Sequence, residues 1–330
     1  MAQEVFQLDN LDRKILYLLD QNSRQSSTKI AKYCHVHKNV INFRLNRLIE
    51  RGIIRQFVAM ISPSALGLTP YKIYLQLQSF DSVKEQKLLN FIQKLPVYWS
   101  AKVSGRWDFI IGLLLKDTKE LQEIQYKLIN EFGSDITTKT LSILVEAPHF
   151  SRKYLSDKPD HKVEYWLKSR ETKKVDALDL KILKILAKNC RTPVVDIAKS
   201  IKATVKTIIS RMRALEKRKV VYDYRISLNL EKIGYHFFKC FISLKNADQN
   251  QIKALISYCQ TNPNIIHLIE CVGDWELEPE FEVESFEKFQ EILEEIKSKF
   301  NGIIKNVETI DIIKENDYIC LPGNAWDIPL

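Results

Sequence analysis

The sequence predicts an α+β protein that consists of two copies of one two-domain unit. Apolar residues recur at helical spacing over residues 8–54, and a sharp turn divides the stretch Thr28–Ile54. From Pro70 onward, strand patterns alternate with two amphipathic helices in the order βαββαβ. The pattern around Asp9 then returns around Asp176, followed by a second βαββαβ segment. These observations predict two helical domains and two sheet domains.

The first helical domain is expected to begin at Asp9, whose carboxylate can cap a helix by accepting a backbone N–H. The buried stripe of this helix is formed by Leu11, Ile15, Leu18 and Leu19. A polar turn leads to a second helix around Ile30–Lys32, and a third helix follows. Gly52 is suited to the left-handed residue that ends the third helix. Residues 53–61 are expected to form a short strand or wing.

The third helix, from about Lys38, separates three kinds of side chain onto different faces. The apolar face holds Ile41, Leu45 and Leu48, the amide face holds Asn39, Asn42 and Asn46, and the cationic face holds Arg44, Arg47 and Arg51. A helix of this kind can pack on a core by one side and enter a DNA groove by another. An ordinary solvated helix would explain the pattern if it occurred only once, but the whole arrangement occurs twice.

The chemistry of these side chains suits DNA, since Asn pairs with adenine edges and Arg pairs with guanine or phosphate. We expect contacts near base edges from Lys38, Asn39 and Asn42. We expect contacts with phosphates, or bracing of the helix, from Arg44, Arg47 and Arg51. For Arg44 the alternative is a buried ion pair with neighbouring helices, because it lies next to the apolar stripe and recurs as Arg211.

The sheet domain is predicted from alternating apolar residues and two helical stripes. The expected strands are Tyr71–Ser79, Val97–Ser104, Trp107–Lys116 and Thr138–Glu146, and the expected helices are Val83–Leu95 and Thr118–Phe132. Both helices should cover one face of an antiparallel sheet. Tyr74, Ile110 and Leu114 point to the opposite face, so a partner sheet is expected to cover them.

The stretch 149–174 is charged and contains Pro159, so we expect an extended linker between the two copies. The predicted boundaries are 1–62 for the first helical domain with its wing, 63–148 for the first sheet domain, 149–174 for the linker, 175–229 for the second helical domain, and 230–330 for the second sheet domain with its tail. A chain of two fused units should pair its own sheet domains, because a covalent link raises their effective concentration.

The third helix of the second copy carries three candidate DNA contacts, Lys206, Arg211 and Arg213. Its amide face is lost, because Lys206, Ile209 and Arg213 stand where the first copy has asparagines. We therefore expect base readout by the second helical domain to differ or to be weaker. An alternative for the second copy is that it serves as a protein-interaction scaffold and no longer binds DNA.

The amino-acid composition restricts the possible classes of function but does not identify one. The net charge of +9 and the pI near 9.0 permit a nucleic-acid partner but are weak support alone. No apolar run reaches the roughly 18 residues that span a bilayer, and the first residues lack a signal pattern, so we expect a cytoplasmic protein without a membrane partner. The 6 cysteines are scattered singly, and only Cys34 to His37 groups ligand-type residues. We expect no metal and no cofactor.

The motifs resemble one family of regulators. Both copies carry L-D-x-x-D-x-x-I-L or its close variant followed by x-I-A-K, an arginine-bearing third helix, and a G-x-W-D or G-x-W-E motif in the sheet domain. This pattern resembles the Lrp/AsnC (feast/famine) transcription factors over nearly all of the chain outside the linker and tail. The resemblance implies winged helix-turn-helix domains, ferredoxin-like effector domains that pair through their sheets, double-stranded DNA as a partner, a small effector such as an amino acid, and further assembly into a homo-oligomer.

The sequence departs from the family pattern in the turn before the third helix. His35 and Lys202 stand where the family commonly has Gly, so this turn must tolerate side chains there, at a cost of about 1 kcal/mol if these residues are left-handed. We expect the turn to be kept but adjusted. A second departure is that Gly52 is replaced by Lys219 in the second copy.

An effector pocket is expected beside the glycine motifs of the two sheet domains. The candidate ligand-binding residues are Gly105, Trp107 and Asp108 in the first copy, and Gly273, Trp275 and Glu276 in the second. A turn glycine lets a ligand approach the backbone, and the carboxylate can accept bonds from an ammonium group. The alternative is that the glycines form hairpin turns and the tryptophans pack in the core.

A different class of function stays open, because sirohaem decarboxylases resemble the same family and share its two-domain unit. Such an enzyme needs His and Arg side chains around an anionic tetrapyrrole. The sheet domains offer few histidines, namely His236 and His267 in the second domain and none in the first before His149. No catalytic motif stands out elsewhere, so we expect no enzyme. The alternating glutamates from Glu278 to Glu284 indicate a solvated or salt-bridged strand face rather than a metal site.

Overall fold

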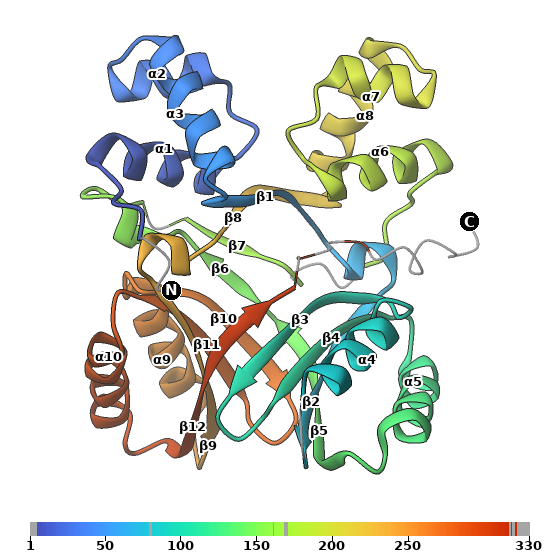
Figure 1. Cartoon of the computed structure of the whole chain (residues 1–330), viewed down its shortest axis with the longest axis vertical. Coiled ribbons are helices and arrows are strands. Elements are labelled where there is room, and N and C mark those ends of the chain that lie inside the picture. The colour runs from blue at the N-terminus through green and yellow to red at the C-terminus, as the bar shows by residue number, and fades with distance from the viewer. Residues whose placement is uncertain are drawn as a thin grey trace.

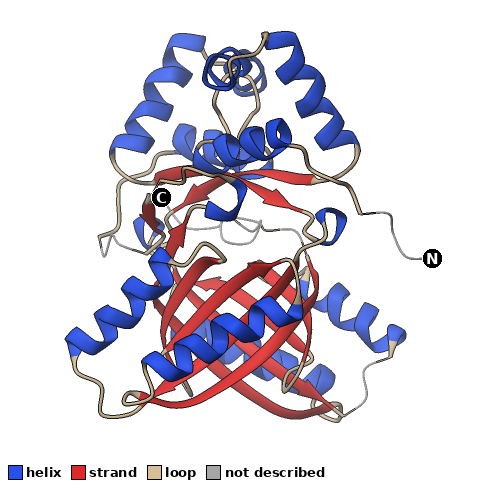
Figure 2. Cartoon of the chain, turned by 90° about the vertical axis from the view of Figure 1, so that its left-hand side faces the viewer, coloured by secondary structure: helices blue, strands red, loops and turns tan. Residues whose placement is uncertain are grey.

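The computed structural model describes residues 5–78, 81–160, 162–167, 171–316, 318 and 321 of the 330-residue chain. Two helical heads stand side by side at one end of the molecule, and the sheet domains of both copies form the other end (Figure 1). A two-stranded sheet lies between the heads and the sheet domains (Figure 2). Within the described residues, no helix has the length and apolar character required to cross a membrane.

The first head consists of α1 (Asn10–Gln21), α2 (Ser27–Cys34) and α3 (Lys38–Glu50). Asp9 caps α1 as predicted, since its carboxylate accepts the backbone N–H of Asp12 at 2.8 Å. His35, in the turn before α3, is left-handed with φ of 54°. The turn therefore keeps the sharp geometry although a left-handed non-glycine residue costs about 1–2 kcal/mol.

The second head repeats this design with α6 (Ala177–Lys188), α7 (Val194–Ile201) and α8 (Val205–Lys217). Asp176 caps α6 through the backbone N–H of Asp179 at 2.9 Å. Lys202 is left-handed with φ of 60°, like its counterpart in the first head. Lys219 has φ of 58° where Gly52 has 66°, so the lysine keeps the backbone geometry of the glycine.

The sheet between heads and sheet domains is shared by the two copies. β1 (Ile54–Ile61) runs antiparallel to β8 (Val221–Leu228), with Phe57 opposite Ile226. The wing strand expected after the first head is therefore completed by the other copy. Its own copy supplies no second strand there, because the chain leaves β1 through the short helix η1 (Ser64–Leu66) and enters the sheet domain.

Both sheet domains have the predicted βαββαβ order. The first consists of β2 (Thr69–Leu77), α4 (Ser82–Ile92), β3 (Val97–Ser104), β4 (Phe109–Leu115), α5 (Thr118–Phe132) and β5 (Ile136–Glu146). The second follows η3 (Glu231–Ile233) and consists of β9 (His236–Leu244), α9 (Gln249–Thr261), β10 (Ile265–Val272), β11 (Leu277–Val283), α10 (Phe286–Lys299) and β12 (Ile304–Glu315).

The strands of the two copies close into one barrel, with the four helices outside it (Figures 1 and 2). The hydrogen-bonded order is β11, β9, β12, β3, β4, β2, β5 and β10, and β10 pairs back to β11. The copies join where Ser104 lies opposite Asp311 and where Leu144 lies opposite Cys271. We expected two sheets that face each other, and the structure also joins their edges, which leaves no unpaired edge in the ring.

The sheet face opposite the helices, for which the sequence predicted a partner sheet, lines the interior of the barrel. Tyr74, Ile110 and Leu114 are buried, as expected. The Tyr74 ring packs against the rings of Phe241 and Trp275 from the second copy, with centroid distances of 5.4 Å and 4.9 Å. The two copies therefore share one core.

The connector between the copies is more ordered than the extended linker we expected. It contains β6 (Pro148–Phe150), η2 (Lys153–Leu155) and β7 (Val163–Tyr165). β6 pairs with β10, and Phe150, Leu155 and Trp166 are buried. The apolar residues are spaced too irregularly to indicate a strand or helix, so their burial was not predicted.

Candidate nucleic-acid interface and central cavity

The third helix of the first head presents a mixed polar and apolar surface to solvent. Asn39, Val40, Phe43 and Asn46 of α3 are exposed, while Ile41, Leu45 and Leu48 are buried in the head. The side chain of Phe43 is 65% exposed, which is unusual for a large apolar residue on an otherwise polar surface. Lys38 is exposed and Asn42 is partly exposed, so the three expected base-contacting residues lie on the solvent side of α3.

Two of the three expected arginines brace α3 against α1. Arg47 Nη2 lies 2.6 Å from Asp12 Oδ2, and Arg44 contacts both Asp12 and Asp9. Burial opposes ionisation of Asp9, but the Asp12 backbone N–H and the Arg44 guanidinium lower its pKa. Arg51 is exposed and makes no ion pair with any described residue. The structure therefore favours the bracing role for Arg44 and Arg47.

The second head keeps the arginine brace between its first and third helices, but one of the two arginines comes from a different position. Arg211 Nη1 lies 2.6 Å from Asp176 Oδ2, and Arg218 Nη2 lies 2.9 Å from Asp179 Oδ2. Arg218, which stands at the position of Arg51, thus takes the role that Arg47 has in the first head. Lys206 and Arg213 are exposed, and neither forms an ion pair within the described part of the chain. The solvent side of α8 is therefore more basic than that of α3.

The glycines of the expected effector motifs lie directly beside the backbone of the other copy. A Cβ on Gly105 would lie 2.9 Å from the carbonyl oxygen of Thr309, and a Cβ on Gly273 would lie 2.7 Å from that of Leu141. Gly105 also has φ of 135°, which disfavours any other residue. These positions need glycine because a backbone of the other copy passes directly beside them.

The remaining residues of these motifs hold the barrel together. Trp107 and Trp275 are buried and 6.4 Å apart between ring centroids. Asp108 Oδ2 accepts the backbone N–H of Leu77 at 2.7 Å, and Glu276 Oε2 accepts that of Leu244 at 2.8 Å. Each carboxylate thus has one oxygen engaged with a neighbouring strand.

An ion network runs through the barrel interior. Glu278 Oε2 lies 2.7 Å from Lys72 Nζ and 2.9 Å from Lys239 Nζ, and Lys239 also contacts Glu280 at 2.6 Å. Burial opposes ionisation of Glu278, but Lys239 and Lys72 hold its pKa below the ordinary value. The alternating glutamates of β11 are therefore salt-bridged, which is one of the two arrangements expected for them. Glu284, which follows the strand, is exposed.

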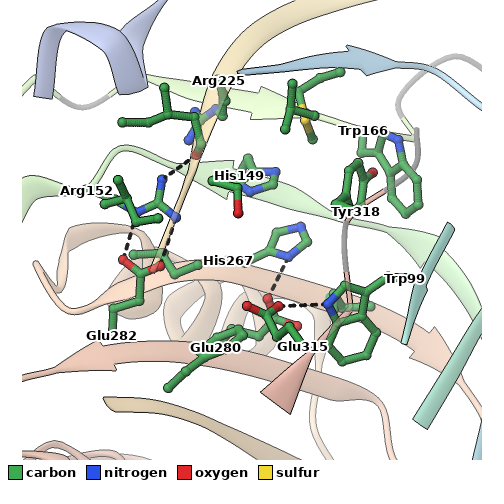
Figure 3. Close-up of a pocket in the computed structure, with 18 of the residues that line it drawn as sticks. Trp99, His149, Arg152, Trp166, Arg225, His267, Glu280, Glu282, Glu315 and Tyr318 are labelled. Carbon is green, nitrogen blue, oxygen red and sulfur yellow. Dashed lines mark hydrogen bonds and ion pairs between the residues drawn. The ribbon is translucent and has the colours of Figure 1, made fainter. Parts of the chain in front are cut away.

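A cavity of about 140 Å³ lies between the β1–β8 sheet and the mouth of the barrel. Figure 3 shows the polar side chains that line it, which come from several elements of both copies. Arg152 binds Glu282 through Nε at 2.8 Å and Asp20 through Nη1 at 2.6 Å. Trp99 Nε1 donates to Glu315 at 2.8 Å, and burial raises the pKa of this carboxyl.

Two histidines stack at the cavity wall. The rings of His149 and His267 are 4.1 Å apart and nearly parallel, at 17°. His267 Nδ1 lies 3.1 Å from Glu280 Oε2. Burial, followed by the neighbouring His267 ring and the Arg225 guanidinium, lowers the pKa of His149 well below 6.5. His149 is therefore neutral at physiological pH.

Four buried polar atoms around the cavity have no hydrogen-bond partner within the described residues. They are Arg225 Nη2, His149 Nδ1, His267 Nε2 and Tyr98 Oη. Buried polar atoms are nearly always paired in proteins, so this group indicates a place where a ligand or water completes the bonding. Sequence reasoning noted the two histidines singly and missed the cluster, because the four side chains come from different strands. No group of three or more potential metal ligands occurs among the described residues.

Comparison with known proteins identifies the heads. A family model described as a winged helix-turn-helix DNA-binding domain matches residues 8–55, and one for the AsnC-type helix-turn-helix domain matches residues 175–216. An HTH-type transcriptional regulator of Pyrococcus abyssi is 33% identical over 137 residues, which are 41% of this chain and 84% of that protein. The regulator Ptr1 of Methanocaldococcus jannaschii is 33% identical over 135 residues, which are 39% of this chain and 90% of that protein. Each relative thus spans about one copy.

A solved structure resembles the whole chain. The sirohaem decarboxylase NirDL, in complex with an iron-uroporphyrin III analogue, is 13% identical with a TM-score of 0.62, and the similarity covers 96% of both chains. At this low identity the similarity shows the duplicated fold and not the activity.

The matches to two helix-turn-helix family models and to HTH-type transcriptional regulators show that this chain is a DNA-binding transcriptional regulator. The chain belongs to the Lrp/AsnC family, as an internally duplicated member. Its relatives are regulators, which confirms the prediction of a regulator rather than an enzyme.

Proposed function

We propose that one chain binds one duplex DNA site with both heads, and that the first head reads the bases while the second contacts mainly phosphates. The observation that carries this proposal is the β1–β8 pairing, which holds both heads at the same end of the molecule. A DNA-binding dimer contacts two half-sites, and here the two heads are joined covalently. Action on chromosomal DNA would place the protein in the cytoplasm.

Base reading by the first head is supported by the solvent side of α3. Asn39 and Asn42 supply the amide groups that suit adenine edges, and Lys38 supplies a cation near the start of the helix. The exposed Phe43 ring suits apolar contact with a thymine methyl group in the major groove. Arg51, which follows α3 directly, is the arginine placed to reach a phosphate, since Arg44 and Arg47 are engaged with α1.

Phosphate contact by the second head is supported by Lys206 and Arg213. Both side chains are exposed on α8, and the amide face of α3 has no counterpart there. Phosphate contacts position a protein on DNA without reading its sequence. Arg211, like Arg44, acts as a brace and contributes to DNA binding by holding its helix in place.

The experiment selects preferred sequences from random duplexes with the full-length protein. Asn42→Ala and Phe43→Ala should relax base preference at one half-site, with roughly 1–3 kcal/mol lost for each good base contact. Asn301→Ala, an exposed asparagine in the turn after α10, is the matched control and should leave the preference unchanged. Equal sequence preference of Asn42→Ala and the control would show that α3 does not read the bases.

Regulation by a small effector, with an amino acid as the candidate class, is part of the proposal. The expected site at Gly105, Trp107, Asp108, Gly273, Trp275 and Glu276 stays a prediction, as does assembly of several chains. Each motif carboxylate retains one oxygen that could accept an ammonium N–H. The aromatic rings, in contrast, are already used in the barrel core.

The fold shared with NirDL makes tetrapyrrole chemistry the alternative to test. The cavity brings together two imidazoles and two guanidinium groups, which such an anionic macrocycle would need. Its volume of about 140 Å³ is below the roughly 300–1,000 Å³ of pockets for drug-sized ligands, and Arg152 is engaged with the carboxylates of Asp20 and Glu282 and with the carbonyl oxygen of Ile226. Titration with an iron uroporphyrin, followed by visible absorption, should show no saturable spectral change. A stoichiometric change would support the enzyme reading instead.

A further inference from the structure

The two heads, which stand side by side in Figure 1, contact each other directly through one turn of each head. The turn between α1 and α2 contains Ser23 and Arg24, and the turn between α6 and α7 contains Cys190 and Arg191. Ser23 and Cys190 are completely buried, and Ser23 Oγ lies 3.0 Å from Cys190 Sγ. Because equivalent residues of the two copies meet here, the contact lies on the pseudo-twofold axis that relates the heads.

Each head also reaches across to the backbone of the other through its arginine. The acceptors are carbonyl oxygens of the opposite turn, namely those of Cys190 and Thr192 for Arg24 Nη1, and those of Ser23 and Gln25 for Arg191 Nη1. A guanidinium donates in fixed directions, and a charged donor makes a stronger hydrogen bond than a neutral one. We call Ser23, Arg24, Cys190 and Arg191 the head clasp.

The head clasp is anchored on the wing sheet in an exchanged manner. The backbone N–H of Ser23 donates to the carbonyl oxygen of Tyr224 on β8 at 2.8 Å, and that of Cys190 donates to Phe57 on β1 at 2.9 Å. The arginine that follows each of these residues lies over the same aromatic ring, at 5.6 Å and 5.3 Å from the ring centroid. Each head is therefore attached to the wing strand of the other copy.

Apolar packing supports each head on the same strand but does not set its orientation toward the other head. Ile15 and Leu19 of α1 share a buried cluster with Ile226 of β8, and Ile182 of α6 shares one with Val58 of β1. Burial of apolar surface is non-directional, so it holds a head on the sheet and keeps it folded. The directional bonds between the heads come from the head clasp.

The arginines of the head clasp occur in both copies, although the two heads differ where they are expected to face DNA. Arg24 corresponds to Arg191, whereas Asn42 of α3 corresponds to Ile209 of α8. A symmetric contact requires the same residue on both sides of the axis. We propose that Arg24 and Arg191 are positioning residues for DNA binding, which hold the heads in the one relative placement that lets both engage the same duplex.

This inference rests on the proposed function for its DNA step, whereas the contact between the heads can be tested without DNA. Heads that move independently lose orientational freedom when both bind, and this loss weakens binding. Heads that are already held in the binding placement avoid that loss, so the second head acts at a high effective concentration beside the first. Loss of the head clasp should therefore weaken binding only where both heads engage the DNA.

The head clasp is first measured in the free, full-length protein by disulfide trapping. Ser23→Cys places a second thiol opposite Cys190, and the short distance between the two side chains lets mild oxidation join the heads. Mass spectrometry of the digested chain identifies this disulfide. Arg24→Met and Arg191→Met together remove the donors but keep side chains of similar length, so they should slow its formation by at least fivefold. Absence of the disulfide, or an unchanged rate, would overturn the proposal.

DNA binding is then compared on two duplexes, one long enough for both heads and one truncated to the bases of the first head. The variant with both arginine changes should bind the long duplex at least tenfold more weakly than the wild type, and the short duplex within twofold. Lys14→Met with Lys181→Met removes two charges at equivalent exposed positions of α1 and α6, and should change the ratio of the two affinities by less than twofold. Weakening by the same factor on both duplexes would show that the arginines do not position the heads.

A disulfide rescue separates positioning from folding. When Ser23→Cys is combined with both arginine changes, the oxidised protein should bind the long duplex within threefold of the wild type, and reduction should remove this gain. An oxidised protein that binds as weakly as the reduced one contradicts the positioning role. If the wild type binds neither duplex, the proposed function is wrong and the DNA step falls with it, while the trapping rates still decide whether the arginines hold the heads together.

Discussion

Lys72 Nζ lies 2.7 Å from Glu278 Oε2, and the two residues belong to different copies of the unit. Lys239 Nζ contacts the same oxygen at 2.9 Å from the strand beside Glu278. All three side chains are almost completely buried. A carboxylate from one copy thus neutralises a buried cation from the other, which ties the two copies into one folding unit.

Loss of the Glu278 charge should destabilise the whole barrel. Glu278→Gln leaves two buried ammonium groups with less compensating charge, and we expect the free energy of unfolding to fall by about 3–5 kcal/mol. Urea denaturation measures this change. Glu284→Gln, at the exposed end of the same glutamate stripe, is the control and should change stability by less than about 0.5 kcal/mol. Equal unfolding midpoints for the two variants would contradict a stabilising network.

Stability should fall in two steps as the pH is lowered. His149 has a folded pKa well below 6.5, so below pH 6.5 the unfolded chain binds a proton that the folded chain does not, and stability is lost. Glu278 has a folded pKa below its ordinary 4.5, so its contribution is present above pH 4.5 and is lost as the pH falls further. Urea unfolding of the wild type from pH 8 to pH 3 should show both phases, and Glu278→Gln should weaken the second. Stability that is constant from pH 8 to pH 5 would contradict a buried neutral His149.

Because the two copies approach each other closely at Gly105 and Gly273, replacing either glycine by alanine should lower the stability of the protein. In Gly105→Ala and Gly273→Ala the new methyl group meets a backbone carbonyl of the other copy at 2.9 Å or less. We expect each to lower the free energy of unfolding by about 1–3 kcal/mol. Gly302→Ala is the matched control, because nothing lies within 4 Å of its added methyl group. Tolerance of both alanines at the level of the control would mean that the strands do not meet there.

The arginine braces should act on folding before they act on DNA. Arg44→Ala removes a partner of the fully buried Asp12, and we expect a loss of about 1–3 kcal/mol in stability. Asn46→Ala, on the exposed side of the same helix, should have little effect on stability. Thermal unfolding compares the two variants. An Arg44→Ala protein with unchanged stability and weaker DNA binding would assign this arginine to the DNA instead.

The sequence predicted correctly those features that depend on interactions between residues close together in the chain. The Asp9 cap, the turn that is kept at His35 and Lys202, and the βαββαβ order depend on residues near one another in the chain, and the structure confirms them. The duplication was equally visible, because it appears as repeated side chains at fixed spacing. These features define the units but not how the units are joined.

Closure of the barrel and the cavity could not be predicted in the same way. The pairing of β3 with β12 depends on which strand edges meet, and edge pairing leaves no pattern in either strand alone. Likewise, His149 and His267 lie more than a hundred residues apart and become neighbours only when β6 pairs with β10. The burial of Trp166 in a charged connector depends on the space left between wing and barrel.

The central claim is that one chain uses both heads on one DNA site, and the salt dependence of duplex binding tests it most directly. The logarithm of the binding constant is measured against the logarithm of salt concentration for the full chain at one chain per duplex. Each phosphate contact contributes about 0.9 to the slope, so Lys206→Ala and Arg213→Ala in the second head, and Arg51→Ala in the first, should each reduce it by about that amount. Slopes that match the wild type in all three variants, or a complex that needs two chains to occupy one site, would contradict the account.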